Sequence, residues 1–258
     1  MSNESWDEKL AAQEASDESE DDRQYHDAAL AVLDPAQRQK YLDDPFDTLI
    51  LIRAFRNESP RLEITCRNLK AIAEWRKKVE FDTFLSRRID GDEIFHQCWP
   101  EKIFGYDSYG HLILGTRICE LNCDKLESFS EAAVERLVGQ KLSALMAIKR
   151  ERHALTGARR YKHTSVIDLS GLSTALLAGH RRALIKRVMD IGTHLYPETA
   201  WKIYILNAPL VFRAVWLVVK PWLHPKTLAK ISILGSSPAR AMQADGDSPS
   251  LPPPPSSS

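Results

Sequence analysis

The polar residues best placed for catalysis surround one apolar segment, Ser165–Leu169. Asp168 lies at the end of this segment, and His163, His180 and His194 are near it in the sequence. Catalytic groups of α/β proteins often follow the end of a strand. However, the sequence has no Gly-x-Ser-x-Gly elbow, no Walker loop, no dinucleotide-binding Gly-x-Gly-x-x-Gly and no His-Glu-x-x-His. We therefore expect Asp168 to be structural, no residue to be catalytic, and the protein not to be an enzyme.

Metal chemistry has a similarly weak basis in the sequence. Cys119 and Cys123 are four residues apart, and His111 lies nearby. A structural zinc site needs a second pair of ligands at suitable spacing, and the sequence shows none. We expect neither a metal nor a cofactor. Four cysteines without a basic and apolar leader indicate reduced thiols, which are typical of a cytoplasmic protein.

The most unusual stretch is Leu210–Val219, in which Arg213 is the only polar side chain. The apolar segments Trp201–Leu206 and Lys230–Leu234 flank it and predict two strands with a helix between them. About 20 residues are needed to span a bilayer, so this helix is too short to do so. A helix that is apolar nearly all round must cover its second face too, with more protein or with a non-protein ligand.

The remaining pattern predicts an α/β fold with a mostly parallel sheet, preceded by a small all-α region. Asp34-Pro35 and Asp44-Pro45 are typical starts of helices, each with a capping carboxylate before a proline. Ser128 and Glu131 have the spacing of a capping box before another helix. Strands alternate with helices from residue 99 onward, and this order favours parallel pairing with helices flanking the sheet.

The segment YPETAWKIYILNAPLVFRAVWLVVKPWLHPKTLAKISILGSS, residues 196–237, closely resembles the C-terminal half of the CRAL-TRIO lipid-binding domain. That family includes phosphatidylinositol/phosphatidylcholine transfer proteins and tocopherol- and retinal-binding proteins. GYDSYGHLILGTR resembles the first strands of the domain, and LIRAFRN followed by WRK resembles the helical region that precedes it. The resemblance implies a lipid-binding and lipid-transfer protein, with a role of the phosphatidylinositol-signalling type.

In this family the apolar helix is a mobile gate over a lipid cavity. The resemblance therefore implies that the gate and cavity residues lie on this helix and directly after it: Phe212, Val215, Trp216, Val219 and Lys220. Glu198, Thr227 and Lys230 match head-group residues of members that bind phosphatidylinositol. Ser165 matches one of two hydroxyl residues in the phosphatidylcholine pattern. Bound acyl chains would supply affinity, at about 0.8 kcal/mol per buried methylene, and these polar groups would supply selectivity.

Two departures leave the choice of lipid open. Glu58 and Ser59 stand where phosphatidylinositol-binding members carry a basic pair, although Arg56 or Arg61 could replace it. His163 stands where the phosphatidylcholine pattern has its second hydroxyl residue. Another phospholipid, a sterol or an isoprenoid-like molecule is therefore an alternative ligand.

Composition divides the chain further. Residues 1–24 carry nine Asp and Glu against Lys9 and Arg23, a composition typical of a solvated segment. We expect a disordered acidic tail at 1–25, a helical subdomain at 26–98, the CRAL-TRIO-like domain at 99–235 and a disordered Pro- and Ser-rich tail at 236–258.

Partners follow from charge and from the resemblance. The formal net charge is zero, which argues against nucleic acid as a partner. A lipid carrier must unload at a membrane, so we expect transient, peripheral membrane association of a cytoplasmic protein. Each basic residue near an anionic leaflet contributes about 1 kcal/mol to membrane binding. Basic residues of this chain cluster in two segments: Lys141, Lys149, Arg150, Arg152, Arg159, Arg160 and Lys162, and then Arg181, Arg182, Lys186 and Arg187. The alternative is an interaction module with a collapsed cavity, which would recruit protein partners through its tails, above all the Pro-rich C-terminal one.

Overall fold

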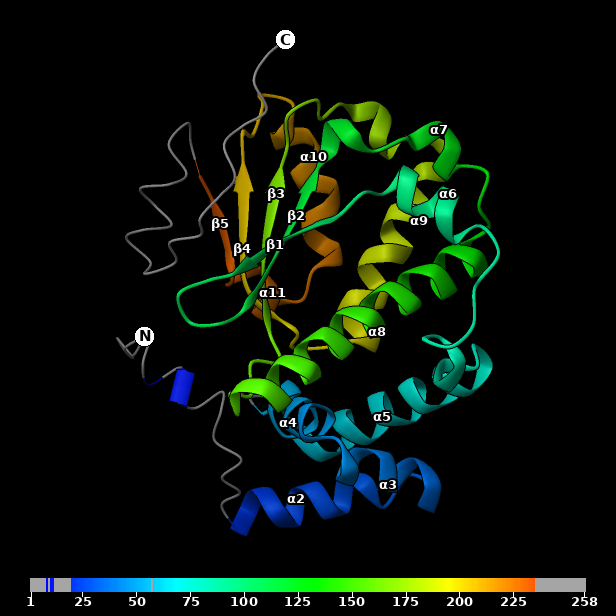
Figure 1. The fold of residues 1–258 in the computed structure, drawn as a ribbon. Coiled ribbons are helices and arrows are strands. Elements are labelled where there is room, and N and C mark those ends of the chain that lie inside the picture. The colour runs from blue at the N-terminus through cyan, green and yellow to red at the C-terminus, as the bar shows by residue number, and fades with distance from the viewer. Residues whose placement is uncertain (1–7, 9, 12–19, 57, 235–258) are drawn as a thin grey trace. The chain divides into compact units, whose positions relative to one another are not determined.

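The computed structural model describes residues 8, 10–11, 20–56 and 58–234 and divides the chain into two compact units (Figure 1). The helical unit consists of Met1–Ile89, Val138–Tyr161 and Ile191–Thr199. The sheet unit consists of Asp90–Leu137, Lys162–Asp190 and Ala200–Ser258. Neither unit is one continuous stretch, so each is held together by contacts between segments far apart in the sequence.

The helical unit is built from helices that pack around apolar side chains. Its elements are α2 (Glu20–Leu30), α3 (Pro35–Asp43), α4 (Pro45–Ala54), α5 (Arg61–Lys78), the 3-10 turn η1 (Phe81–Thr83), the part of α8 (Glu131–Thr156) from Val138 onward, and the π-helical turn η4 (Ile191–Leu195). One cluster comprises Ala29, Leu30, Leu33, Tyr41, Leu51, Leu69 and Ala73, and another comprises Phe46, Leu49, Met146 and Tyr161. Burial of these side chains fixes the helices against one another.

Both helix starts expected from Asp-Pro pairs are confirmed. Asp34 caps α3 by accepting a hydrogen bond from the Gln37 amide, and the Gln37 side chain returns one from the Asp34 amide. Asp44 caps α4 by accepting from the amides of Phe46 and Asp47. Each cap satisfies backbone donors that the first helical turn leaves without partners.

The acidic N-terminal segment differs from the expectation of a solvated tail through residue 25. Residues 20–25 begin α2, and the Asp22 side chain is only 5% exposed. Arg56 and Arg61 donate to its carboxylate at 3.2 and 3.3 Å, which offsets the cost of burying the charge. Arg61 also donates to the Ile52 carbonyl and lies over the Tyr25 ring. These two arginines therefore anchor α2, and the rest of the expected N-terminal tail, like the C-terminal tail at 236–258, falls largely or wholly outside the described residues.

The sheet unit contains a five-stranded sheet in the order β1-β2-β3-β4-β5. Strand β1 (Lys102–Tyr106) is antiparallel to β2 (Leu112–Arg117), whereas β3 (His163–Asp168), β4 (Ala200–Leu206) and β5 (Ile231–Ile233) continue the sheet in parallel with β2. The mostly parallel α/β fold is thus confirmed. The other elements are α6 (Asp92–Cys98), η2 (Ile118–Glu120), α7 (Cys123–Leu126), the start of α8, η3 (Thr174–Leu177), α9 (Gly179–Asp190), α10 (Phe212–Val219), η5 (Lys220–Trp222) and α11 (Pro225–Leu228).

The predicted capping box at Ser128 is wrong. Helix α8 begins at Glu131, and its first turn is capped by Ser130, whose hydroxyl accepts from the Ala133 amide at 3.1 Å. Ser128 instead donates to the Lys125 carbonyl at the end of α7. Two serines stand close together here, and only the backbone geometry decides which one is the cap.

The two faces of the sheet have different neighbours. Helix α10 lies against one face of the sheet (Figure 1). This α10 face carries Ile167 and Ile205, which belong to one apolar cluster with α10. The opposite face carries a separate cluster of Ile113, Val166, Tyr204 and Leu206. Phe104 packs on this opposite face over Gly115, where a Cβ would lie 2.0 Å from its ring. Strand alternation therefore decides which residues can face α10.

Candidate functional site

The candidate site is the α10 face of the sheet together with α10 itself. Val215 of α10 is 7% exposed and packs with Leu169, Leu172 and Ile205. Three further apolar side chains of α10 pack against the same cluster: Phe212, Trp216 and Val219. The rings of Phe212 and Trp216 lie 5.5 Å apart, so together they form a continuous aromatic layer. All four apolar residues expected in the gate and cavity wall thus lie on the sheet side of α10.

The outer side of α10 is also apolar. Leu217 is 76% exposed, and Leu210, just before the helix, is 95% exposed. Arg213 and Lys220 are exposed nearby, and the Arg182 guanidinium lies 5.8 Å from the centre of the Trp222 ring. Exposed apolar side chains flanked by cations and an aromatic ring are typical of surfaces that bind anionic membranes. Sequence reasoning missed Leu210 and Leu217, because a helix that is apolar all round gives no periodic signal of its outer face.

Three of the expected head-group residues belong to the sheet unit. Ser165 pairs with Ile203 of β4, and the Ile203 amide donates to the Lys230 carbonyl at 3.0 Å. The backbones of Ser165 and Lys230 thus stand at one level of the sheet, two strand spacings of about 4.8 Å apart. Ile231, the residue after Lys230, packs in the α10 cluster, so alternation directs the Lys230 side chain toward the opposite face. The Lys230 amide in turn donates to the Thr227 carbonyl at the end of α11. Ser165 shares the α10 face with Ile167, so its hydroxyl is on the side that α10 covers.

The fourth expected head-group residue, Glu198, belongs to the helical unit. Its backbone has a φ of 60°, in the left-handed region that few residues other than glycine adopt. Its charge, together with burial as the larger cause, raises the pKa of the Tyr161 phenol. Glu198 therefore lies near Tyr161, and its role toward a head group stays a prediction.

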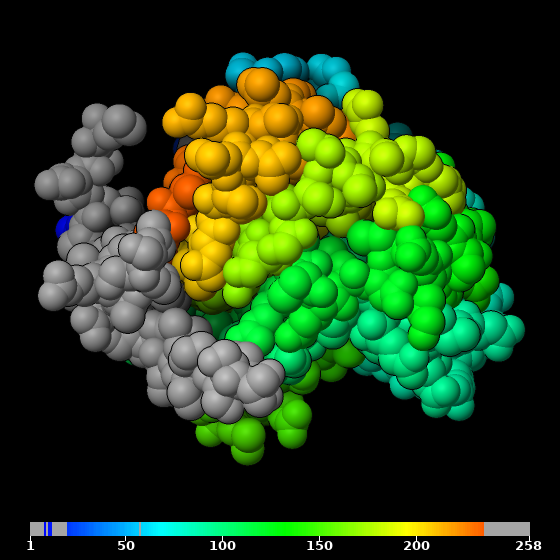
Figure 2. All heavy atoms as spheres, turned by 90° about the horizontal axis from the view of Figure 1, so that it is seen from above, coloured from blue at the N-terminus to red at the C-terminus, as the bar shows by residue number. Residues whose placement is uncertain are grey.

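Asp168 connects the ends of two neighbouring strands. One of its carboxylate oxygens accepts from the Ser170 amide at 2.9 Å, the Ser170 hydroxyl at 2.7 Å and the Asn207 side chain at 2.9 Å. In Figure 2 the segments that follow β2, β3 and β4 lie side by side as green, yellow-green and gold bands. The carboxylate thus holds together the turns after β3 and β4, which agrees with the expected structural role.

These contacts predict a loss of stability in acid. Burial alone would raise the pKa of Asp168, but its hydrogen bonds with Asn207 and Ser170 and the charge of Arg117 hold that pKa below its usual value. A depressed folded-state pKa contributes stability above the unfolded pKa of about 3.9, and this stability is lost as the pH falls through the folded value. We expect Asp168→Asn to lower the melting temperature at neutral pH and to lose less on acidification to pH 3 than the wild type. If the melting temperatures of the two proteins fell by the same amount between neutral pH and pH 3, the role assigned to the Asp168 carboxylate would be contradicted.

The cysteines show no metal arrangement. Cys66, Cys98, Cys119 and Cys123 are free thiols, and burial is the main cause that raises the pKa of both Cys98 and Cys123. Within the described ranges, no group of three or more His, Cys, Asp or Glu is placed to hold a metal ion. None of the helices in those ranges has the length and apolar character needed to cross a membrane.

Comparisons with known proteins agree with the geometry. A family model described as the CRAL/TRIO domain matches residues 96–252. Phosphatidylinositol/phosphatidylcholine transfer protein SFH9 of Arabidopsis thaliana is 28% identical over 199 residues, which cover 75% of this chain and 34% of that protein. SEC14 cytosolic factor of Eremothecium gossypii is 26% identical over 219 residues, 82% of this chain and 70% of that protein.

Two further observations concern coverage and fold. The chain spans 34% and 40% of the length of two Arabidopsis relatives, SFH9 and SFH12. The crystal structure of Sfh5 superimposes with a TM-score of 0.62 at 19% identity, covering 89% of this chain and 85% of that one. At this identity the match shows a shared fold.

Proposed function

Because the chain belongs to the CRAL/TRIO domain family, whose model matches residues 96–252, we propose that it encloses a single phospholipid or similar hydrophobic molecule and exchanges it at membranes. In this proposal α10 is the gate. The protein acts as a peripheral, cytoplasmic carrier, with phosphatidylinositol or phosphatidylcholine as the first candidates. These two lipids appear in the names of its Arabidopsis relatives.

The observation that carries the proposal is the two-sided apolar character of α10. Its inner side covers an apolar face of the sheet through Val215, Phe212 and Trp216. Its outer side exposes Leu217 between the cations Arg213 and Lys220. An ordinary surface helix would carry polar residues on that side. An apolar outer side is suited to a helix that leaves the sheet for the membrane interface, where burial of Leu217 and Leu210 offsets the contacts it gives up.

The head group would be selected by Ser165 on the α10 face, with Thr227 and Lys230 beyond it at the β5 edge of the sheet. A lysine ammonium is a compact charge that binds a phosphate, while hydroxyls such as those of Ser165 and Thr227 bind phosphate or inositol oxygens. Acyl chains would lie along the apolar α10 face, which holds Ile167 and Ile205. Such a site is mostly apolar, with a few polar groups that fix orientation.

A pair of aspartate substitutions in α10 tests the proposal. The purified chain is incubated with vesicles of phosphatidylcholine and phosphatidylinositol, re-isolated, and its organic extract analysed by mass spectrometry. We expect about one phospholipid per wild-type chain. Trp216→Asp should carry at least about tenfold less phospholipid, because a charge on the inner side of α10 costs several kcal/mol. Circular dichroism confirms that each variant is folded.

Leu217→Asp is the matched control on the outer side of the same helix. It should retain its lipid but transfer it between vesicles more slowly, because only its membrane contact is lost. Folded wild-type protein that stays empty after incubation would overturn the carrier and favour an interaction module with a collapsed cavity. Equal lipid content in wild type and Trp216→Asp would remove α10 from the site.

A further inference from the structure

A cavity lies within the helical unit. Its volume is about 510 Å³, and α3, α4, α5, η1, α8 and the segment after η4 all contribute to its lining. A neighbouring cavity of about 350 Å³ shares Lys40, Tyr41, Arg76, Phe81 and Asp82 with it. Small-molecule sites typically occupy about 300–1,000 Å³. The larger cavity is therefore of the size that holds a ligand, and it consists of residues of the helical unit alone.

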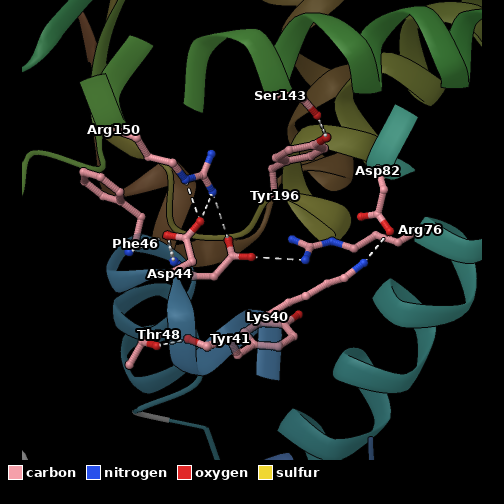
Figure 3. Close-up of polar contacts among 11 residues, drawn as sticks. Lys40, Tyr41, Asp44, Phe46, Thr48, Arg76, Asp82, Ser143, Arg150 and Tyr196 are labelled. Atoms are coloured by element: carbon pink, nitrogen blue, oxygen red, sulfur yellow. Dashed lines mark hydrogen bonds and ion pairs between the residues drawn. The ribbon is translucent and has the colours of Figure 1, made fainter. Parts of the chain in front are cut away.

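The charged groups of this cavity are already paired with one another. The Arg76 guanidinium donates to Asp47 at 3.1 Å, and the Arg150 Nε donates to Asp44 at 2.6 Å (Figure 3). Lys40 pairs with Asp82. Counting the remaining carboxylate, Asp43, the lining has three cations and four anions. An anionic ligand would meet a surplus of carboxylates, so the cavity favours a neutral one.

One buried donor remains in this wall. The Arg76 Nε is buried and has no hydrogen-bond partner among the described residues. The guanidinium is held between two aromatic rings, 4.6 Å from the Phe81 centroid and 5.5 Å from that of Tyr41. A buried N–H without an acceptor costs about 1–3 kcal/mol. A ligand that carries a carbonyl, ester or ether oxygen would supply this acceptor without adding charge.

The rest of the wall is apolar. Ile50 and Leu51 of α4, Leu69 and Ile72 of α5, and Met146 of α8 all line the cavity. Methionine adapts its shape to an irregular apolar ligand. The lining therefore combines an extended apolar surface with one donor near its polar side, which is the distribution expected for an amphiphile with a short polar end.

An exposed ion pair lies at the boundary that the two cavities share. Lys40 of α3 and Asp82 of η1 line both cavities, and their side chains are 52% and 69% exposed. Figure 3 shows this pair beside Arg76. An exposed ion pair of this kind contributes about 0–1 kcal/mol, so it opposes only weakly a ligand that extends from one cavity into the other.

We propose that this cavity is a second ligand site, which binds a neutral amphiphile with an apolar chain and one acceptor oxygen. The site is separate from the lipid proposed for the sheet unit and does not depend on it. It selects against carboxylates and phosphates through its surplus of acidic groups, and it accepts esters, ketones or ethers through Arg76.

The experiment compares two probes of equal chain length on the full chain. Methyl decanoate is a neutral ester, and decanoate is its anionic counterpart at neutral pH. Binding is measured by ligand-observed NMR titration. We expect the ester to bind at least about tenfold more tightly than the anion, a difference of about 1.4 kcal/mol.

Variants locate the bound ester. Ile50→Trp fills the cavity and should weaken binding at least about tenfold, whereas Leu62→Trp, on α5 outside the cavity lining, should leave it within about twofold. Leu85→Trp is a second filler at a cavity residue that is 62% exposed and therefore tolerates a large side chain. The proposal would be overturned if neither Ile50→Trp nor Leu85→Trp weakened binding of the ester, if both probes bound equally well, or if the ester did not bind at all. Binding lost in Trp216→Asp but retained in the fillers would place the ester in the sheet unit, and this outcome too would overturn the second site while supporting the first.

Discussion

Asp107→Ala is expected to lower the free energy of unfolding of the sheet unit by about 3–4 kcal/mol. Asp107 precedes β2, and its side chain is only 1% exposed. One carboxylate oxygen accepts from the amides of Tyr109 and His111 at 3.0 and 2.8 Å. The other lies 3.2 Å from the His111 Nδ1 and 2.9 Å from the Thr164 hydroxyl. Alanine would leave these groups without their acceptor inside the protein.

The expected loss is large because the whole network is buried. His111 and Thr164 are 0% exposed, and the His111 ring stacks on Trp201 at 4.5 Å. Water cannot readily replace the lost acceptor there, and each unsatisfied group costs about 1–3 kcal/mol before relaxation. Burial alone would raise the pKa of Asp107, but the bonds and charge of His111, with Thr164, lower that pKa overall. The ionised carboxylate is thus the form that the fold stabilises.

Hydrogen exchange by mass spectrometry on peptides covering β2 and β3 measures this loss in the sheet unit itself. Asp124→Ala is the matched control, because the Asp124 side chain is 89% exposed and pairs with Arg181 on the surface of the same unit. That control should cost at most about 1 kcal/mol. Equal exchange rates in the two variants would show that the Asp107 network adds no more than a surface ion pair.

The network also has a consequence for the proposed lipid site. Asp107 joins His111, at the start of β2, to Thr164, at the start of β3. This connection helps to fix the register that pairs Leu114 with Ser165. A slip by one residue would move every side chain of a strand to the other face. We therefore expect Asp107→Ala to loosen the placement of Ser165 on the α10 face.

Local signals made much of this fold predictable from sequence. Asp34-Pro35 and Asp44-Pro45 specify helix starts because a cap depends on residues within one turn of it. The strand–helix–strand order around α10 follows in the same way from composition. The match of Ser128 to a capping box failed because Ser130, two residues away, offers the same chemistry.

Other features depend on partners that no local pattern reveals. Asp22 stands in an acidic run that favours solvent, yet Arg56 and Arg61, more than 30 residues away, hold it in the interior. In α10 apolar residues occupy both the inner and the outer side, and Arg213 is the only polar residue between them. Only tertiary packing separates Val215, which is 7% exposed, from Leu217, which is 76% exposed. The cavity of the helical unit likewise arises from helices that meet only in the folded chain.

Asp47→Ala is expected to destabilise the helical unit by about 3–4 kcal/mol. Asp47 follows the cap of α4, and its carboxylate accepts from Arg76 at 3.1 Å and lies 3.7 Å from an Arg150 nitrogen. Burial alone would lower the pKa of Arg76, but the adjacent Asp47 raises it, so the guanidinium stays charged. Removing Asp47 would leave that charge inside the protein without its main partner.

A second pair in the same unit provides the control. Lys40 and Asp82 are exposed, so Asp82→Ala should cost about 0–1 kcal/mol. The double variant Asp47→Leu, Arg76→Met removes both charges at once and should recover most of the loss, because apolar side chains can replace a buried ion pair at little cost. Urea denaturation followed by circular dichroism gives all four free energies. If Asp47→Ala costs no more than Asp82→Ala, or if the double variant is less stable than Asp47→Ala, then packing around Arg76 rather than its charge holds these helices together.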